Sequence, residues 1–239
     1  MTEFDQYRDG YSAQIDDAIA FSGQPQDFFT RAKARYLLDT FSKVRSQNDT
    51  SSKPLDVLDI GCGHGLIHPH LRPAQSGIKL TGIDVAGTVI EEARADNPDV
   101  HYDVYEGTRL PYDARTFDIA FAIAVMHHVP PDDWKSFLVE AARVVRPGGL
   151  VIIIEHNPLN PLTQKIVRSC PFDQNAVLLR SNRLAKLFRA AGMVDIERQF
   201  IIFTPFDTPF FHKLDASLGW LPLGAQYCMS ARVPSIDGA

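Results

Sequence analysis

The sequence predicts a doubly wound α/β domain with a mostly parallel, seven-stranded sheet. From Leu55 onward, short apolar runs alternate with helical stretches, which is typical of βαβ units. The 239 residues are 45% hydrophobic and 22% charged, an ordinary balance for one globular domain with a sizeable core. The expected strands are Leu55–Ile60, Lys79–Ile83, Val100–Val104, Phe117–Ile123, Gly149–Glu155, Val194–Phe203 and Gln226–Val233.

The chain divides into three consecutive parts. Apolar positions recur at helical spacing before a polar loop that ends at Pro54, so we expect residues 1–53 to form a helical lid. Residues 54–157 are the expected α/β core. Residues 158–239 complete the same domain, with an amphipathic helix that Gly192 ends and an aromatic insertion at about 204–224.

Composition and charge narrow the range of partners. The net charge is −5 and the basic residues are scattered, which argues against nucleic-acid binding and favours a small-molecule partner. The longest apolar runs are too short to cross a bilayer, so we expect no stable membrane insertion. Cys62, Cys170 and Cys228 lie far apart without metal or disulfide spacing, as expected of reduced thiols in a cytoplasmic protein. No pattern indicates the oligomeric state.

The strongest motif follows the first expected strand. Asp59 is followed by glycines at alternate positions, Gly61, Gly63 and Gly65, and glycine there allows a tight turn and close approach of the backbone to a ligand. Leu66 occupies the place where a dinucleotide-binding loop requires its third glycine. The spacing therefore argues against NAD.

This motif resembles the first motif of the class I S-adenosylmethionine-dependent methyltransferases. The resemblance implies the Rossmann-like fold of that family and S-adenosylmethionine as cofactor. It also implies that the loop backbone cradles the methionine part of the cofactor, while the acidic residue helps to hold its ammonium group. In this sequence the resemblance assigns these contacts to Asp59, Gly61, Cys62 and Gly63.

Further cofactor ligands follow the next strands. Asp84 lies about twenty residues past the glycine loop, where its carboxylate would accept hydrogen bonds from the ribose hydroxyls of the cofactor; the alternative is a helix N-cap. Val85, the next residue, is also a candidate cofactor-binding residue. Later segments resemble the family's adenine motif and its fourth motif. The residues they imply at the cofactor are Glu106, Gly107, Ala122 and Ile123.

Histidines follow the fourth and fifth strands, at the edge of the sheet where ligands bind. His127, His128 and His156 are candidate catalytic groups, because an imidazole can remove a proton from an acceptor near neutral pH. The alternative for His127 and His128 is packing or capping at a helix start. His64 and His68 are expected on a helix surface, and without a third ligand they predict no metal site.

The expected reaction is methyl transfer from S-adenosylmethionine to a small-molecule acceptor with an apolar or aromatic part. Aromatic side chains in the two lid segments predict that acceptor, and Tyr7, Tyr11, Phe206 and Phe210 are the candidate substrate-binding residues. Positioning of the reactants would supply most of the rate. Two alternatives remain: a non-catalytic module that binds S-adenosylmethionine, and an NAD-dependent oxidoreductase.

Overall fold

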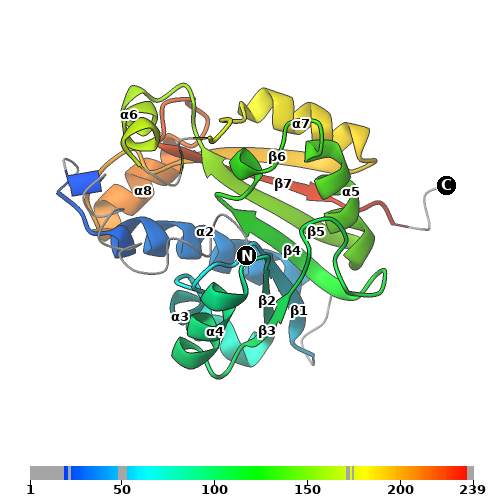
Figure 1. The fold of residues 1–239 in the computed structure, drawn as a ribbon. Helices are drawn as coiled ribbons and strands as arrows, with labels where there is room; N and C mark the ends of the chain where they lie inside the picture. The colour runs from blue at the N-terminus through cyan, green and yellow to red at the C-terminus, as the bar shows by residue number, and fades with distance from the viewer. Residues whose placement is uncertain (1–18, 21–22, 48–52, 171–172, 174, 236–239) are drawn as a thin grey trace.

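A seven-stranded sheet forms the centre of the molecule, in agreement with the sequence. The computed structural model describes residues 19–20, 23–47, 53–170, 173 and 175–235. The strand order is β3-β2-β1-β4-β5-β7-β6, and β7 runs antiparallel to both of its neighbours while the other pairings are parallel (Figure 1). The strands are β1 Leu55–Ile60, β2 Ile78–Asp84, β3 His101–Val104, β4 Phe117–Ile123, β5 Val145–His156, β6 Val194–Ile201 and β7 Gln226–Arg232.

Helices cover both faces of this sheet. The long helix α2 packs on one face, and α5 and α7 pack together on the other. The helices are α2 Gln26–Gln47, α3 His68–Leu71, α4 Gly87–Asp96, α5 Trp134–Val144, α6 Pro161–Ser169, α7 Ser181–Ala190 and α8 Pro209–Ser217, with short 3₁₀ turns at η3 Arg72–Gly77 and η4 Met126–His128. The predicted amphipathic helix before Gly192 is α7.

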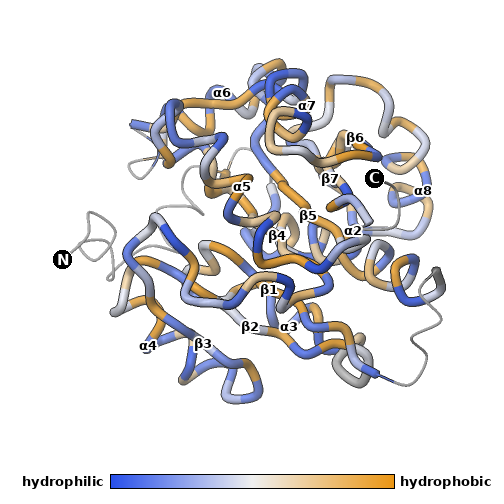
Figure 2. The backbone as a smooth tube through the Cα atoms, turned by 90° about the vertical axis from the view of Figure 1, so that its right-hand side faces the viewer, coloured by the Kyte–Doolittle hydropathy of each residue, from blue (hydrophilic) through white to orange (hydrophobic). Residues whose placement is uncertain are grey.

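Side chains alternate between two cores, one on each face of the sheet. In β4, Ile119 and Phe121 join the core under α2, whereas Ala120 and Ala122 join the core under α5 and α7. Both sets are buried, so the central strands are apolar on both faces, and much of β5 has the hydrophobic colour in Figure 2. This double burial explains the continuous apolar runs in the sequence.

Helix α2 forms part of the hydrophobic core on its own face of the sheet. Leu37, Phe41 and Val44 are buried against side chains of β1, β4 and β5. The division of the chain at residue 53 stays a prediction, but α2 is held to the sheet along its length. The aromatic insertion contains a helix, α8, that the sequence pattern did not indicate.

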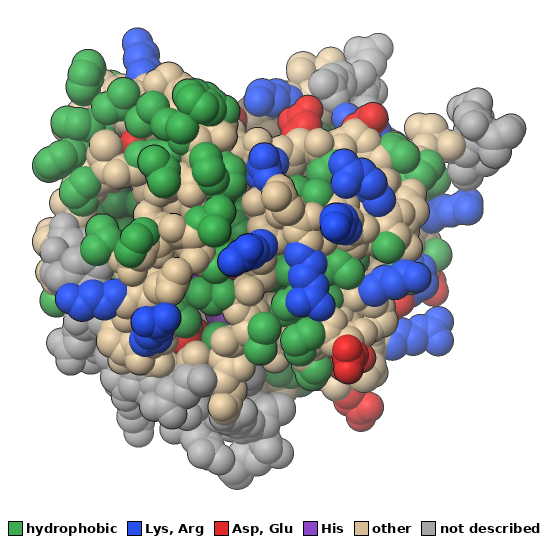
Figure 3. Space-filling view, turned by 90° about the horizontal axis from the view of Figure 1, so that it is seen from above, with side chains coloured by type: hydrophobic (Ala, Val, Ile, Leu, Met, Phe, Trp, Pro, Cys, Tyr) green, Lys and Arg blue, Asp and Glu red, His purple; other side chains and the backbone are tan. Residues whose placement is uncertain are grey.

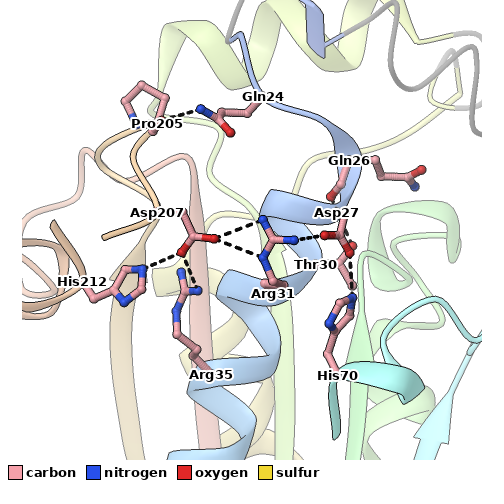
Figure 4. Close-up of polar contacts among 10 residues, drawn as sticks. All are labelled: Gln24, Gln26, Asp27, Thr30, Arg31, Arg35, His70, Pro205, Asp207 and His212. Carbon is pink, nitrogen blue, oxygen red and sulfur yellow. Dashed lines mark hydrogen bonds and ion pairs between the residues drawn. The ribbon is translucent and has the colours of Figure 1, made fainter. Parts of the chain in front are cut away.

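A cluster of charged side chains links α2 to the connection between β6 and α8. We define the Asp207 cluster as Arg31, Arg35, Asp207 and His212, in which the carboxylate accepts hydrogen bonds from both arginines and from the histidine (Figure 4). The Asp207 oxygens lie 3.1 Å from Arg31 Nε and 3.0 Å from Arg35 Nη1. Arg31 also pairs with Asp27. Segments about 175 residues apart are thereby joined above the sheet.

Candidate functional site

A cavity of about 670 Å³ opens at the carboxyl ends of β1, β2, β4 and β5. In sheets of this topology, ligands bind at that edge, beside the point where the strand order reverses. Residues of the glycine loop, α2, η4 and α6 line it, together with His156 and Gln226 at the adjoining ends of β5 and β7. One cavity therefore extends from the glycine loop to the predicted catalytic histidines.

At Gly61 and Gly63 the glycine loop presents backbone without a side chain to this cavity. Gly61, Gly63 and Gly65 have φ values of 74°, 51° and 66°, in the region that favours glycine. A Cβ atom built on Gly63 would meet no protein atom within 4 Å, whereas one on Gly61 would lie 2.5 Å from Val125 Cγ2. The amides of Gly61 and Cys62 donate to the Ile83 carbonyl and fix the loop against β2.

Asp84 lies beside the glycine loop, at the same end of the cavity. Its Oδ2 accepts from the Gly63 amide at 2.9 Å, and its Oδ1 accepts from the Ala86 amide at 3.0 Å. The carboxylate thus joins the glycine loop to the start of α4, and it also lines the cavity. Each oxygen retains a second lone pair for a ligand hydroxyl.

The structure brings most of the other predicted cofactor residues to the cavity, with two exceptions. Val85, Gly107 and Ile123 line it. Ala122 does not, because strand alternation turns it into the core under α5 and α7. Glu106 is exposed and lies outside the cavity lining.

Asp59 belongs to a buried polar chain that the sequence did not indicate. Its Oδ2 lies 3.0 Å from His68 Nε2, and His68 Nδ1 contacts the hydroxyl of Tyr102. A carboxylate only accepts, so His68 donates to Asp59 from Nε2. Burial raises the pKa of Asp59 while the bond from His68 opposes that shift. The expectation of a surface His68 was wrong, because its helix is a single turn packed beneath the glycine loop.

Two further polar residues at this end were not predicted as ligands. Lys33 of α2 lines the cavity, and burial lowers its pKa from the usual 10.5 to about 8, although Asp59 and Glu155 oppose the shift. Lys33 lies four residues after Phe29 and four before Leu37, on the apolar stripe of the helix. A charge on that stripe is the signal that could have identified it. His64 lines the cavity with its Nδ1 3.0 Å from Glu92 Oε2.

The three predicted catalytic histidines meet at the other end of the cavity. His127, His128 and His156 all line it, with ring centroids of His127 and His156 5.2 Å apart. His127 Nδ1 lies 2.6 Å from Glu155 Oε2, and both side chains are buried. The Nε2 atoms of His127 and His128 each lie 3.5 Å from Asp173 Oδ1. These residues, His127, His128, Glu155, His156 and Asp173, are the histidine cluster.

The three histidine rings of the cluster differ in their pKa values. Burial disfavours a charged His127, but Glu155 and Asp173 outweigh that effect and raise its pKa. Burial, and then the charge on His127, lower the pKa of His128 and of His156 to about 4. At neutral pH the latter two rings are therefore neutral and can accept a hydrogen bond.

An unsatisfied acceptor lies beside the cluster. Gln226 is 7% exposed, lines the cavity, and has no hydrogen-bond partner for its Oε1 within the described part of the chain. It faces His156 across the β5–β7 ladder, so the two side chains share one face of the sheet. A buried acceptor of this kind fits a donor on a ligand, because leaving it unpaired costs about 1–3 kcal/mol.

Of the four predicted substrate residues, the two that the structure describes, Phe206 and Phe210, are not brought to the cavity. Tyr7 and Tyr11 lie outside the described residues. Phe206 and Phe210 are 51% and 69% exposed and do not line it; Phe206 packs against Phe211 instead. Apolar side chains gather on this outer face over α6 and α8 (Figure 3). A role for Phe206 and Phe210 in substrate binding stays a prediction that this geometry does not support, and the role of Tyr7 and Tyr11 stays a prediction.

Comparison with known proteins agrees with the cofactor end of the cavity. A family model described as "Methyltransferase domain" matches residues 58–153. The ubiquinone biosynthesis O-methyltransferase of Rhizobium leguminosarum bv. trifolii (strain WSM2304) is 27% identical over 216 residues, 84% of each chain. The norajmaline N-methyltransferase of Rauvolfia serpentina is 31% identical over 143 residues, which are 56% of this chain and 48% of that enzyme.

Solved structures share the fold. A S-adenosylmethionine-dependent methyltransferase from Thermotoga maritima, described as a possible histamine N-methyltransferase, aligns with a TM-score of 0.65 at 19% identity, covering 96% of this chain and 97% of that one. Among the described residues, no helix is both long and apolar enough to cross a membrane.

Proposed function

Because the chain belongs to the class I S-adenosylmethionine-dependent methyltransferases, we propose that it methylates a small hydroxylated aromatic molecule bound at the histidine cluster. One observation carries this proposal: a single cavity holds the bare glycine loop at one end and neutral histidines with an unpaired amide oxygen at the other. Donor and acceptor would share a space large enough for both.

The residues at the glycine loop fit the cofactor. The space that a Cβ on Gly63 would enter is open, so a ligand can approach the backbone there. The amino acid end of S-adenosylmethionine carries an ammonium and a carboxylate. In this proposal Asp59 and the loop carbonyls receive the ammonium, Lys33 pairs with the carboxylate, and Asp84 accepts the ribose hydroxyls, with Val85 and Gly107 nearer the adenine.

The acceptor end favours an oxygen nucleophile. When bound, S-adenosylmethionine supplies an electrophilic methyl group, so the protein need only align and orient the acceptor. In the proposal His156 accepts a hydrogen bond from the acceptor hydroxyl, while His127 and His128 line the same wall. Gln226 Oε1 accepts from a second polar hydrogen. The apolar walls from Phe29, Ile166 and Phe137 suit an aromatic ring.

The named relatives support this choice of acceptor. Relatives that cover 84% of the chain are O-methyltransferases of ubiquinone biosynthesis, whereas the N-methyltransferase relative covers 56% of it. Methylation of a phenolic oxygen is therefore preferred here to methylation of an amine.

Transfer of a labelled methyl group to panels of phenols, catechols and amines tests the proposal. We expect turnover on hydroxylated aromatics, and His156→Ala should lower it by about a hundredfold while leaving S-adenosylmethionine affinity unchanged. Calorimetry with S-adenosylmethionine and with NAD provides the control for cofactor choice. Cofactor binding without turnover on any acceptor would favour the non-catalytic module, and a His156→Ala enzyme with full turnover would remove His156 from the reaction.

A further inference from the structure

We propose that the histidine cluster is a binding site for one first-row divalent metal ion, zinc by preference, with His127, His128 and Asp173 as its ligands. The inference rests on the proposed function, because the ion would hold the oxygen of the acceptor. No sequence motif indicates it: the histidines lie in η4 and the aspartate more than forty residues later.

Two separations between the candidate ligand atoms match those around an ion. His127 Nε2 and His128 Nε2 each lie 3.5 Å from Asp173 Oδ1, and the three residues offer ligand atoms that all lie within 4.8 Å of one another. Such separations are longer than an ordinary N–H···O hydrogen bond of about 2.9 Å. Bonds of about 2.1 Å to a tetrahedral zinc ion place neighbouring ligand atoms roughly 3.4 Å apart.

Glu155 orients one of the ligands. Its Oε2 lies 2.6 Å from His127 Nδ1, and its Oε1 accepts from the Met126 amide at 2.7 Å, which fixes the carboxylate. His127 is thereby held with Nε2 toward Asp173. A carboxylate that binds the far nitrogen of a histidine is the usual support for a metal ligand, because it sets the ring orientation and strengthens the imidazole as a donor.

The donor set indicates the kind of ion. Two imidazoles and one carboxylate suit zinc, iron, cobalt or nickel, whereas magnesium and calcium prefer sites made of oxygen atoms. Asp173 and Glu155 also bring two carboxylates to the cluster, which favours a cation.

The site would keep an open position toward the acceptor. All three proposed ligands line the cavity, so a fourth ligand would come from the cavity side. Three protein ligands with one open position are typical of catalytic zinc. An acceptor hydroxyl bound there would lose its proton more readily, since a divalent ion stabilises the oxyanion.

Metal binding tests the proposal without any need for turnover. Purified protein is stripped with a chelator and dialysed against zinc, or against cobalt(II) with its visible absorption recorded. We expect one ion per chain. Asp173→Asn and His128→Gln should each weaken binding by at least tenfold, and Glu155→Gln by about 10–100-fold. His101→Ala is the control, because it removes an exposed histidine 3.1 Å from Asp103 and should leave zinc affinity unchanged.

The outcomes separate this inference from the proposed function. Circular dichroism identifies any variant that fails to fold. If Asp173→Asn or His128→Gln does not fold, the zinc affinity of the other variant is the test. Absence of bound zinc, or equal zinc affinity in wild type, Asp173→Asn and His128→Gln, would overturn the metal site. Calorimetry with S-adenosylmethionine on the same stripped samples tests the proposed function independently, since loss of cofactor binding overturns that function and not the ligand geometry.

Discussion

Replacing Lys33 with methionine should raise the free energy of unfolding and weaken the binding of S-adenosylmethionine. The ammonium of Lys33 lines the cavity, and its pKa falls from 10.5 to about 8 because burial removes it from water. At about 1.4 kcal/mol per pKa unit, this lowering corresponds to at most about 3.5 kcal/mol. Methionine keeps the chain length and removes the charge, so the free energy of unfolding should rise by up to that amount at pH 7.

The effect on stability depends on pH in a defined direction. A lysine with a lowered pKa in the folded state destabilises that state fully below pH 8, and the cost disappears as the pH rises from about 8 toward 10.5. The wild type should therefore gain stability over that range relative to Lys33→Met. Urea unfolding at several pH values measures the difference, and Lys43→Met, which changes an exposed lysine of α2, is the matched control.

Binding gives the second half of this prediction. If Lys33 pairs with the carboxylate of S-adenosylmethionine, its loss should cost about 1.5–3 kcal/mol, or roughly ten- to hundredfold in affinity by calorimetry. A Lys33→Met protein that binds S-adenosylmethionine as tightly as wild type would refute the assignment. A variant that is no more stable than wild type at pH 7 would refute the argument from burial.

Three other substitutions follow from the same geometry. Gly63→Val should abolish binding of S-adenosylmethionine, because the side chain would fill the open space beside a backbone φ of 51°; calorimetry on the folded variant measures it. Asp84→Ala should weaken that affinity by more than about a hundredfold, and unchanged affinity would exclude Asp84 as the ribose ligand. His68→Ala should lower the free energy of unfolding by about 3 kcal/mol in urea titrations, since it leaves the Asp59 carboxylate buried without its donor.

Local sequence signals predicted the sheet and the cofactor end well. Alternation of apolar runs with helices indicated all seven strands, although β5 begins at Val145, before the predicted start at Gly149. The glycine loop and Asp84 were identified because parallel strands bring their carboxyl ends to the same edge. Their predicted binding roles stay untested by the fold itself.

The acceptor end was predicted only in part, for a physical reason. His156 follows a strand and was found, whereas Gln226 and Asp173 reach the cavity through contacts that no local pattern encodes. Gln226 begins the antiparallel strand β7, so its neighbour His156 lies 70 residues earlier in the chain. Phe206 and Phe210 show the opposite case, because aromatic composition predicted a lid while the side chains face outward.

The Asp207 cluster also bears on the order in which the molecule is completed during synthesis. Arg31 and Arg35 leave the ribosome early, but the carboxylate that they bind follows more than 170 residues later. The Ile201 and Ile202 side chains that pack in the core beneath α2 are equally late. In a nascent chain that ends before residue 201, α2 lacks the contacts with Ile201, Ile202 and Asp207. Contacts between residues so far apart in sequence form slowly. Lys33 lies on that helix and lines the cavity, so this part of the cavity wall becomes fixed only after residues 201–207 have been made.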